Sequence, residues 1–192
     1  MIHTEIPIIL ASKSPRRKQL LRQIGLNFKV KSFDIDENFT ANDNPIKSVK
    51  KLAIQKLEAA KEKIKNSIVI TADTIVVLDK KIIGKPKDKT EAVKMLKKLS
   101  GNKHYVYSGF AIYNGVTGKT VVDYEKTCVK FRRLSDPEIK EYVETGKPLD
   151  KAGAYGIQED YGAVFVEKIS GDYYNVVGLP LSKFYLRLKE IL

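Results

Sequence analysis

The first apolar segment of the chain predicts a strand, a turn and a helix. Residues 8–11 form a short apolar run that is typical of a buried strand. Ser14 is a suitable N-cap for a helix that begins at Pro15, and Gly25 is suited to end that helix. The chain is therefore expected to open with one β-strand and one α-helix.

An alternating apolar pattern follows this helix. Phe28, Val30 and Phe33 should point inward from a strand that runs into a loop. The loop carries the acidic pair Asp36 and Glu37.

Residues 45–65 predict a long amphipathic helix because apolar residues recur there at helical spacing. The apolar stripe consists of Val49, Leu52, Ala53, Leu57, Ala60 and Ile64. Lys56 falls in the middle of this stripe and not beside it. Its ammonium group must either extend past the packed face to solvent or reach an anion inside the fold.

The apolar run of residues 67–78 predicts a buried strand, and Asp79 with Lys80 predicts the turn of a hairpin. Alternation places Asp73 and Thr74 on opposite faces of this strand. The charge of Asp73 is costly there unless it is paired, bound to a metal or open to a cleft. A structural ion pair and a catalytic carboxylate are both consistent with this position.

The rest of the chain predicts further helices and strands. Residues 89–101 predict a helix, residues 104–134 predict two antiparallel strands around a turn at 114–118, and residues 135–146 predict a helix with a capping box. The tail predicts a glycine-bearing loop, a hairpin that turns at residues 170–172, and a final helix after Pro180.

Two features are interpreted as structural. The segment GVTGKT, residues 115–120, resembles the end of a P-loop, but Tyr113 stands where the first glycine is required. It is predicted to be a hairpin turn. His104 has only His3 as a second histidine, which leaves no set for a zinc site or a catalytic triad, so it is predicted to make a structural hydrogen bond.

Length and composition set the class of protein. A chain of 192 residues with 43% hydrophobic residues is long enough for one domain, residues 1–192, and its size is compatible with two lobes around a cleft. Cys128 is the one cysteine, which excludes an intrachain disulfide and fits a reducing cytosol. The apolar run of residues 6–11 is too short to span a membrane. We therefore expect a cytoplasmic protein with no membrane partner.

The formal charge of +12 favours polyanionic partners such as nucleic acid or nucleotide phosphates. Arg16 and Arg17 lie in the first turn of a helix, where each cation costs roughly 0.3–1 kcal/mol. An anion bound at the turn that begins at Ser14 would explain their position, whereas arginines that pair with nearby acids are the alternative. Lys85 and Lys151 add two loop cations near glycines.

Acidic residues offer a place for a divalent cation. Asp36 and Glu37, together with Asp73, could supply the oxygen ligands that Mg²⁺ prefers, with phosphates and water completing its coordination. The alternative interpretation is that Asp36 and Glu37 only form a solvated acidic loop.

Six motifs, in order along the chain, together resemble the Maf family of nucleoside triphosphate pyrophosphatases. They are LASKSPRRKQLL, TADTIVV, GKP, KLSGNKHYVYSG, LDKAGAYGIQ and FVEKISGDYYNVVGLPL. The resemblance implies a mixed α/β fold related to the inosine triphosphate pyrophosphatases, with a cleft between two lobes. It also implies hydrolysis of the α–β anhydride of a nucleoside triphosphate with Mg²⁺ or Mn²⁺.

The resemblance also implies residue roles. Asp73 corresponds to the proton acceptor that activates water, and Arg16, Thr74 and Gln158 correspond to positions associated with substrate choice. Arg17, Glu37, Lys56 and Lys85 correspond to cleft positions that handle phosphates or metal. Thr74 and the KAGAYGIQ motif are similar to the subgroup that prefers dTTP and UTP.

The chain departs from the family pattern after Gln158, where the segment EDYGAV is one residue longer and begins with Glu159. This departure concerns base selectivity more than reaction type. The expected partner is a nucleoside triphosphate, with no stable nucleic-acid partner, and a homodimer is compatible with the sequence. Two alternatives remain at this point, a basic nucleic-acid-binding protein and an interaction protein that regulates cell division.

Overall fold

The computed structural model describes residues 2–33, 40–158 and 160–192. Its strands are β1 (Ile8–Ala11), β2 (Lys29–Lys31), β3 (Ile68–Leu78), β4 (Lys81–Ile83), β5 (Lys103–Asn114), β6 (Thr120–Phe131) and β7 (Val166–Ser170). Its helices are α1 (Pro15–Gln23), α2 (Pro45–Lys61), α3 (Lys89–Leu99), α4 (Asp136–Glu144), α5 (Asp160–Phe165), α6 (Tyr173–Val177) and α7 (Leu181–Ile191). Two short 3₁₀ segments, η1 (Lys147–Asp150) and η2 (Ala152–Ala154), lie between α4 and α5.

The described strands form one mixed sheet in the order β2-β1-β3-β5-β6-β7, with β4 paired to β3. The pairs β1–β2 and β1–β3 are parallel, whereas β3, β5, β6 and β7 are antiparallel to their neighbours. On one edge of β3, β1 pairs with residues 68–70 and β4 pairs with residues 76–78. The middle of β3 therefore lies at a gap between two partner strands in the described part of the sheet.

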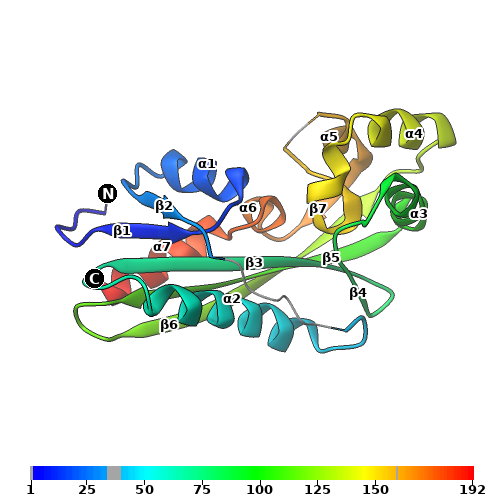
Figure 1. Ribbon diagram of the computed structural model, residues 1–192. Helices are drawn as coiled ribbons and strands as arrows, with labels where there is room; N and C mark the ends of the chain where they lie inside the picture. The colour runs from blue at the N-terminus through cyan, green and yellow to red at the C-terminus, as the bar shows by residue number, and fades with distance from the viewer. Residues whose placement is uncertain (1, 34–39, 159) are drawn as a thin grey trace.

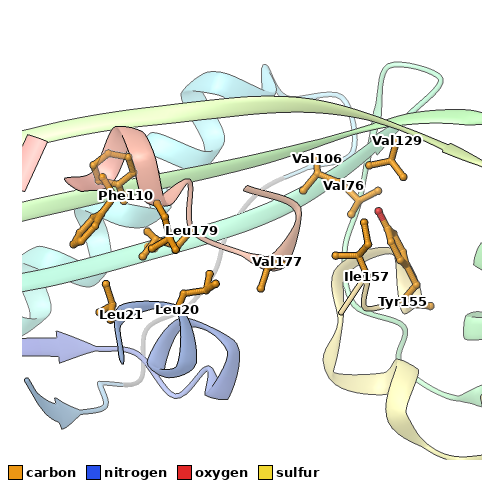
Figure 2. Packing of buried hydrophobic residues seen from close by; sticks show 14 of the residues in the cluster. Leu20, Leu21, Val76, Val106, Phe110, Val129, Tyr155, Ile157, Val177 and Leu179 are labelled. Carbon is orange, nitrogen blue, oxygen red and sulfur yellow. The ribbon is translucent and has the colours of Figure 1, made fainter. Parts of the chain in front are cut away.

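Helices cover both faces of the sheet (Figure 1). The long helix α2 lies on one face, and α1 and α6 lie on the other face at some distance from α3, α4 and α5. Figure 2 shows the core on that second face, where Leu20 and Leu21 of α1 lie near Leu179, and Tyr155 and Ile157 lie near β3 and β5. The two groups of helices on this face correspond to the two predicted lobes.

Most predicted elements are confirmed. All six residues of the stripe predicted for residues 45–65 are buried, although α2 ends at Lys61 and not at Lys65. Asp79 and Lys80 both have positive φ, as a two-residue hairpin turn requires. The GVTGKT segment follows β5 in the turn to β6, so its interpretation as a hairpin turn is also confirmed.

Two predictions about the strands are wrong. Val30 is 39% exposed and not inward, because β2 is a three-residue strand at the end of the sheet. The hairpin predicted at residues 170–172 is instead the junction of β7 with the helix α6. Asp172 caps this helix, since its side chain accepts from the backbone N–H groups of Tyr174 and Asn175.

His104 makes the structural hydrogen bond that the sequence predicts. It is fully buried, and its Nε2 lies 2.7 Å from the hydroxyl of Tyr155. Burial lowers the pKa of His104 to about 4 and raises the pKa of the Tyr155 hydroxyl. The imidazole therefore stays neutral in the folded state at neutral pH.

This burial predicts a specific acid destabilisation. Below pH 6.5 the unfolded chain protonates His104, whereas the folded chain does not until about pH 4. Stability is therefore complete above pH 6.5 and falls as the pH decreases toward 4, by roughly 3 kcal/mol in total from this residue. Urea unfolding at pH 7.5, 6 and 5 should show a shallower pH dependence for His104→Gln than for the wild type. Parallel curves for the two proteins would contradict the assignment.

No helix in the described residues is both long and apolar enough to cross a membrane.

Candidate active site

A cavity of about 360 Å³ lies at the gap in the edge of β3. Its walls come from residues 11–17 before and at the start of α1, residues 73–76 of β3, residues 83–85 at the end of β4, residues 150–152 between η1 and η2, and residues 176–178 at the end of α6. The gap explains how Asp73 and Thr74 both line one cavity although they point to opposite faces of the strand. Every predicted site residue that the structure describes lines it, namely Ser14, Arg16, Arg17, Lys56, Asp73, Thr74, Lys85, Lys151 and Gln158.

Asp73 forms an ion pair with Lys56 of α2. The side chains are 10% and 17% exposed, so the pair is largely sheltered from water yet borders the cavity. Lys56 thus reaches an anion inside the fold and does not extend past the packed face to solvent. Asp73 has the ion-pair partner that the structural interpretation predicts, and it also has the cleft that the catalytic interpretation predicts.

Gly109 of β5 allows α2 to approach the sheet beside this ion pair. It lies opposite Asp73 in the register of β3 and β5. A Cβ atom at Gly109 would lie 2.6 Å from the backbone oxygen of Val49 in α2. The hydroxyl of Thr71 also bonds to the Ala53 carbonyl of α2, at 2.7 Å. The distance between α2 and the sheet therefore determines whether Lys56 reaches Asp73.

Gly109→Ala should displace α2 and weaken the contact between Lys56 and Asp73. We expect a loss of about 1–3 kcal/mol in the free energy of unfolding together with reduced turnover. Gly118→Ala is the control, because Gly118 has a φ of +76° but nothing within 4 Å of an added Cβ. It should lose stability through backbone strain and keep its activity. Unchanged stability and turnover in Gly109→Ala would contradict the role of this close approach.

Arg17 is buried in the cavity wall at the first turn of α1. Its Nε donates to the carbonyl of Gly178 at 3.0 Å, and its terminal nitrogens donate to the hydroxyls of Ser12 and Thr74 at 3.2 Å each. These three acceptors therefore fix the plane of the guanidinium group. A fixed cation at a helix N-terminus is suited to bind an anion.

Arg16 pairs with an acidic side chain, which is the alternative to anion binding that the sequence left open. Its Nη1 lies 3.2 Å from Asp150, whose other oxygen accepts from Lys151 at 2.7 Å. Partial burial raises the pKa of the Asp150 carboxyl, but the hydrogen bond from Lys151 and the charge of Arg16 outweigh this effect, so the pKa is lowered. Asp150 therefore joins α1 to η1 across the cavity wall.

The remaining predicted residues differ in their surroundings. Ser14 caps α1, with its side chain accepting from the Arg17 N–H at 3.4 Å. Lys85 is exposed at the cavity rim and Gln158 is half-buried in its wall. Glu37 and its neighbour Asp36, as well as Glu159, lie outside the described residues.

The sequence analysis missed several residues of this region. Asp150 was overlooked although it directly precedes Lys151 in the LDKAGAYG motif. Ser108 and Asn175 were also overlooked, and both are fully buried behind Thr74. A polar residue within an apolar run, as in YVYSGFAI and YYNVVGL, is the signal that could have found them.

The donor set of the cavity fits a divalent cation that is shared with a ligand. In the described part of the chain, no group of three or more His, Cys, Asp or Glu side chains is arranged to hold a metal ion. Mg²⁺ is commonly bound through one or two carboxylates, with phosphates and waters as its other ligands. Asp73 satisfies this minimal requirement at the cavity wall.

Comparison with known proteins identifies the family. The model described as Maf-like protein matches residues 7–191. The chain belongs to the Maf family. A dTTP/UTP pyrophosphatase of Dictyoglomus turgidum is 50% identical to this Maf protein over 186 residues, which cover 96% of this chain and 94% of the relative. A dTTP/UTP pyrophosphatase of Caldanaerobacter subterraneus is 50% identical over 184 residues, covering 95% and 88%.

A solved structure supports the fold of this Maf protein. A HAM1 protein from Coxiella burnetii superimposes with a TM-score of 0.52 and 13% sequence identity, over 96% of this chain and 99% of that one. The mixed α/β architecture that the sequence predicted is therefore confirmed.

Proposed function

We propose that this Maf protein hydrolyses dTTP and UTP to the nucleoside monophosphate and pyrophosphate. The observation that carries the proposal is the convergence of Asp73 with the cations Arg16, Arg17, Lys56, Lys85 and Lys151 around one cavity. The relatives named dTTP/UTP pyrophosphatase, at about half identity over nearly the whole chain, support the choice of nucleotide.

The cations come from elements that are far apart in the sequence. Arg16 and Arg17 start α1, Lys56 lies on α2, and Lys85 and Lys151 follow β4 and η1. Such an arrangement neutralises the charge of a triphosphate from several sides, which is the main requirement of phosphoryl transfer. The net charge of +12 also favours the approach of an anionic substrate.

Asp73 is the proposed general base. A water molecule attacks the α-phosphorus, its proton passes to the Asp73 carboxylate, and the bond from the α-phosphorus to the bridging oxygen breaks. Pyrophosphate leaves with the electron pair of that bond. Lys56 holds the carboxylate in place through their ion pair, and Arg17 is placed to stabilise charge on the phosphates.

A divalent cation is the proposed cofactor. Asp73, together with Glu37 from outside the described residues, would hold Mg²⁺ or Mn²⁺ against the phosphates. When bound, the ion would supply Lewis-acid stabilisation of the phosphate oxygens.

Product identification tests the proposed function. The purified protein is incubated with a panel of nucleoside triphosphates and Mg²⁺ or Mn²⁺, and the products are separated by ion-exchange chromatography. We expect monophosphate and pyrophosphate, with dTTP and UTP turned over fastest. Formation of diphosphate and phosphate would indicate a different reaction, and no turnover of any nucleotide would contradict the proposal.

A further inference from the structure

A cluster of three charged side chains in the cavity wall has no step in the proposed mechanism. Arg16 of α1, Asp150 of η1 and Lys151 all line the cavity. Oδ2 of Asp150 accepts from Nη1 of Arg16 at 3.2 Å, and Oδ1 accepts from Nζ of Lys151 at 2.7 Å. Each cation therefore binds its own carboxylate oxygen, and the carboxylate lies between them.

The Lys151 end of this cluster is anchored in the fold. Lys151 is 5% exposed, and its Nζ also donates to the Lys147 carbonyl at 2.6 Å. Its backbone N–H donates to the Pro148 carbonyl at 3.1 Å. Asp150 is the last residue of η1 and directly precedes Lys151, so both the backbone and the ammonium group of Lys151 hold its carboxylate in place.

The Arg16 end of the cluster depends on Asp150 for its orientation. Among the described residues, Asp150 is the one hydrogen-bond partner of the Arg16 guanidinium, whereas the neighbouring Arg17 is held by three acceptors. Arginine has one of the largest side-chain entropies, and ordering such a side chain on binding lowers affinity. The contact with Asp150 orders Arg16 before a ligand arrives.

The cluster remains cationic although it contains an acid. Two cations and one carboxylate leave a formal charge of +1. The contact with Asp150 uses one N–H of Arg16, and the guanidinium carries five. The remaining donors suit phosphate oxygens, which an arginine binds through two parallel hydrogen bonds. Asp150 can therefore order Arg16 without removing its ability to bind an anion.

We propose that Asp150, anchored by Lys151, is a positioning residue that orders Arg16 to bind the phosphates of the substrate. This inference rests on the proposed function, because it takes a triphosphate as the ligand of the cavity. An acid without this role would have the opposite effect on binding, since a carboxylate near the phosphates repels them. The sign of the effect of Asp150 on affinity therefore separates the two roles.

The test measures the dissociation constant of inorganic tripolyphosphate in EDTA by isothermal titration calorimetry, at one ionic strength. The four proteins are the wild type, Asp150→Ala, Arg16→Ala and the double variant. We expect Asp150→Ala to raise the dissociation constant by about twofold to tenfold, the usual effect of ordering one long side chain. In the Arg16→Ala background the same substitution should not raise it, because there is no arginine to order.

Two further variants serve as controls. Asp136 also forms an exposed ion pair, with Lys97 at 2.8 Å, and its side chain is 62% exposed against 59% for Asp150, but it does not line the cavity. Asp136→Ala should therefore leave the dissociation constant at the wild-type value. Asp150→Asn retains an oxygen that can accept from Arg16, so it should weaken binding less than Asp150→Ala does.

Tighter binding by Asp150→Ala than by the wild type would overturn the inference, as would an equal rise with and without Arg16. A wild type that binds no tripolyphosphate would also overturn it. If Asp150→Ala does not fold, Asp150→Asn in the two backgrounds is judged by the same criteria. Tripolyphosphate has no base and its binding requires no turnover, so a protein that shows this coupling but does not hydrolyse UTP contradicts the proposed function alone.

Discussion

Asp73→Asn is expected to reduce turnover by roughly 100-fold to 10,000-fold, the usual contribution of a general base. The amide preserves the shape of the carboxylate but accepts a proton far less readily and is a weaker metal ligand. Its oxygen can still accept from Lys56, so the free energy of unfolding should fall by less than about 3 kcal/mol. Pyrophosphate release and urea unfolding measure the two effects.

Asp123→Asn is the matched control for this substitution. Asp123 of β6 also forms an ion pair, at 2.8 Å from Nε of Arg187, but it does not line the cavity. Its loss should leave turnover near the wild-type value. If Asp73→Asn retains activity within a few-fold of the wild type and only loses stability, the ion pair with Lys56 is structural and another group activates the water.

Arg17→Ala is expected to reduce turnover by about 100-fold to 1,000-fold. This is the usual effect of removing one hydrogen-bond donor that stabilises the charge developing in a transition state. It should also destabilise the folded protein by about 1–3 kcal/mol, because the Gly178 carbonyl loses its closer donor and the hydroxyls of Ser12 and Thr74 each lose a hydrogen bond. The helix dipole alone predicts the opposite sign for stability, since a cation leaves the positive end of α1. The buried hydrogen bonds outweigh that surface effect.

Ligand-induced stabilisation separates the two roles of Arg17. UTP in EDTA should raise the melting temperature of the wild type by mass action on the folded state, and should raise that of Arg17→Ala much less. Arg22→Ala is the control, because Arg22 is an exposed residue in the last turn of the same helix. Equal stabilisation of Arg17→Ala and the wild type, with unchanged kinetics, would place the phosphates elsewhere.

The roles of the site residues remain proposals, but their positions could largely be predicted from the sequence. Asp73 and Lys56 stood out because each is a charge at an apolar position, which needs a partner wherever the fold places it. The motifs of the family resemblance added Gln158, which no local pattern indicates, whereas Lys85 had already stood out as a loop cation near a glycine. Asp150 stayed hidden because an acid in a loop is ordinary until its cationic neighbours across the cavity are known.

Local physical chemistry was sufficient for many elements of the fold. Ser14 and Ser135 marked helix starts, and Asp79 with Lys80 marked a turn, because capping and positive φ depend on neighbouring backbone atoms only. The apolar stripe of α2 and the two faces of β3 followed from helical and strand periodicity. These features do not depend on which other segments pack against them.

Tertiary contacts decided the features that local patterns predicted wrongly or did not indicate. The tyrosines and valines of α6 favour a strand, but the cap at Asp172 and the bonds from Asn175 to β5 hold a helix. Val30 alternates like an inward residue, yet β2 lies at the end of the sheet. The Thr74 hydroxyl contacts Ser108, which lies 34 residues away in the sequence, and the Ser108 hydroxyl donates to the carbonyl of Asn175, which lies 67 residues further along. The sequence determined which side chains need a partner, and only the fold determined which partner each one meets, because those partners are distant in the chain.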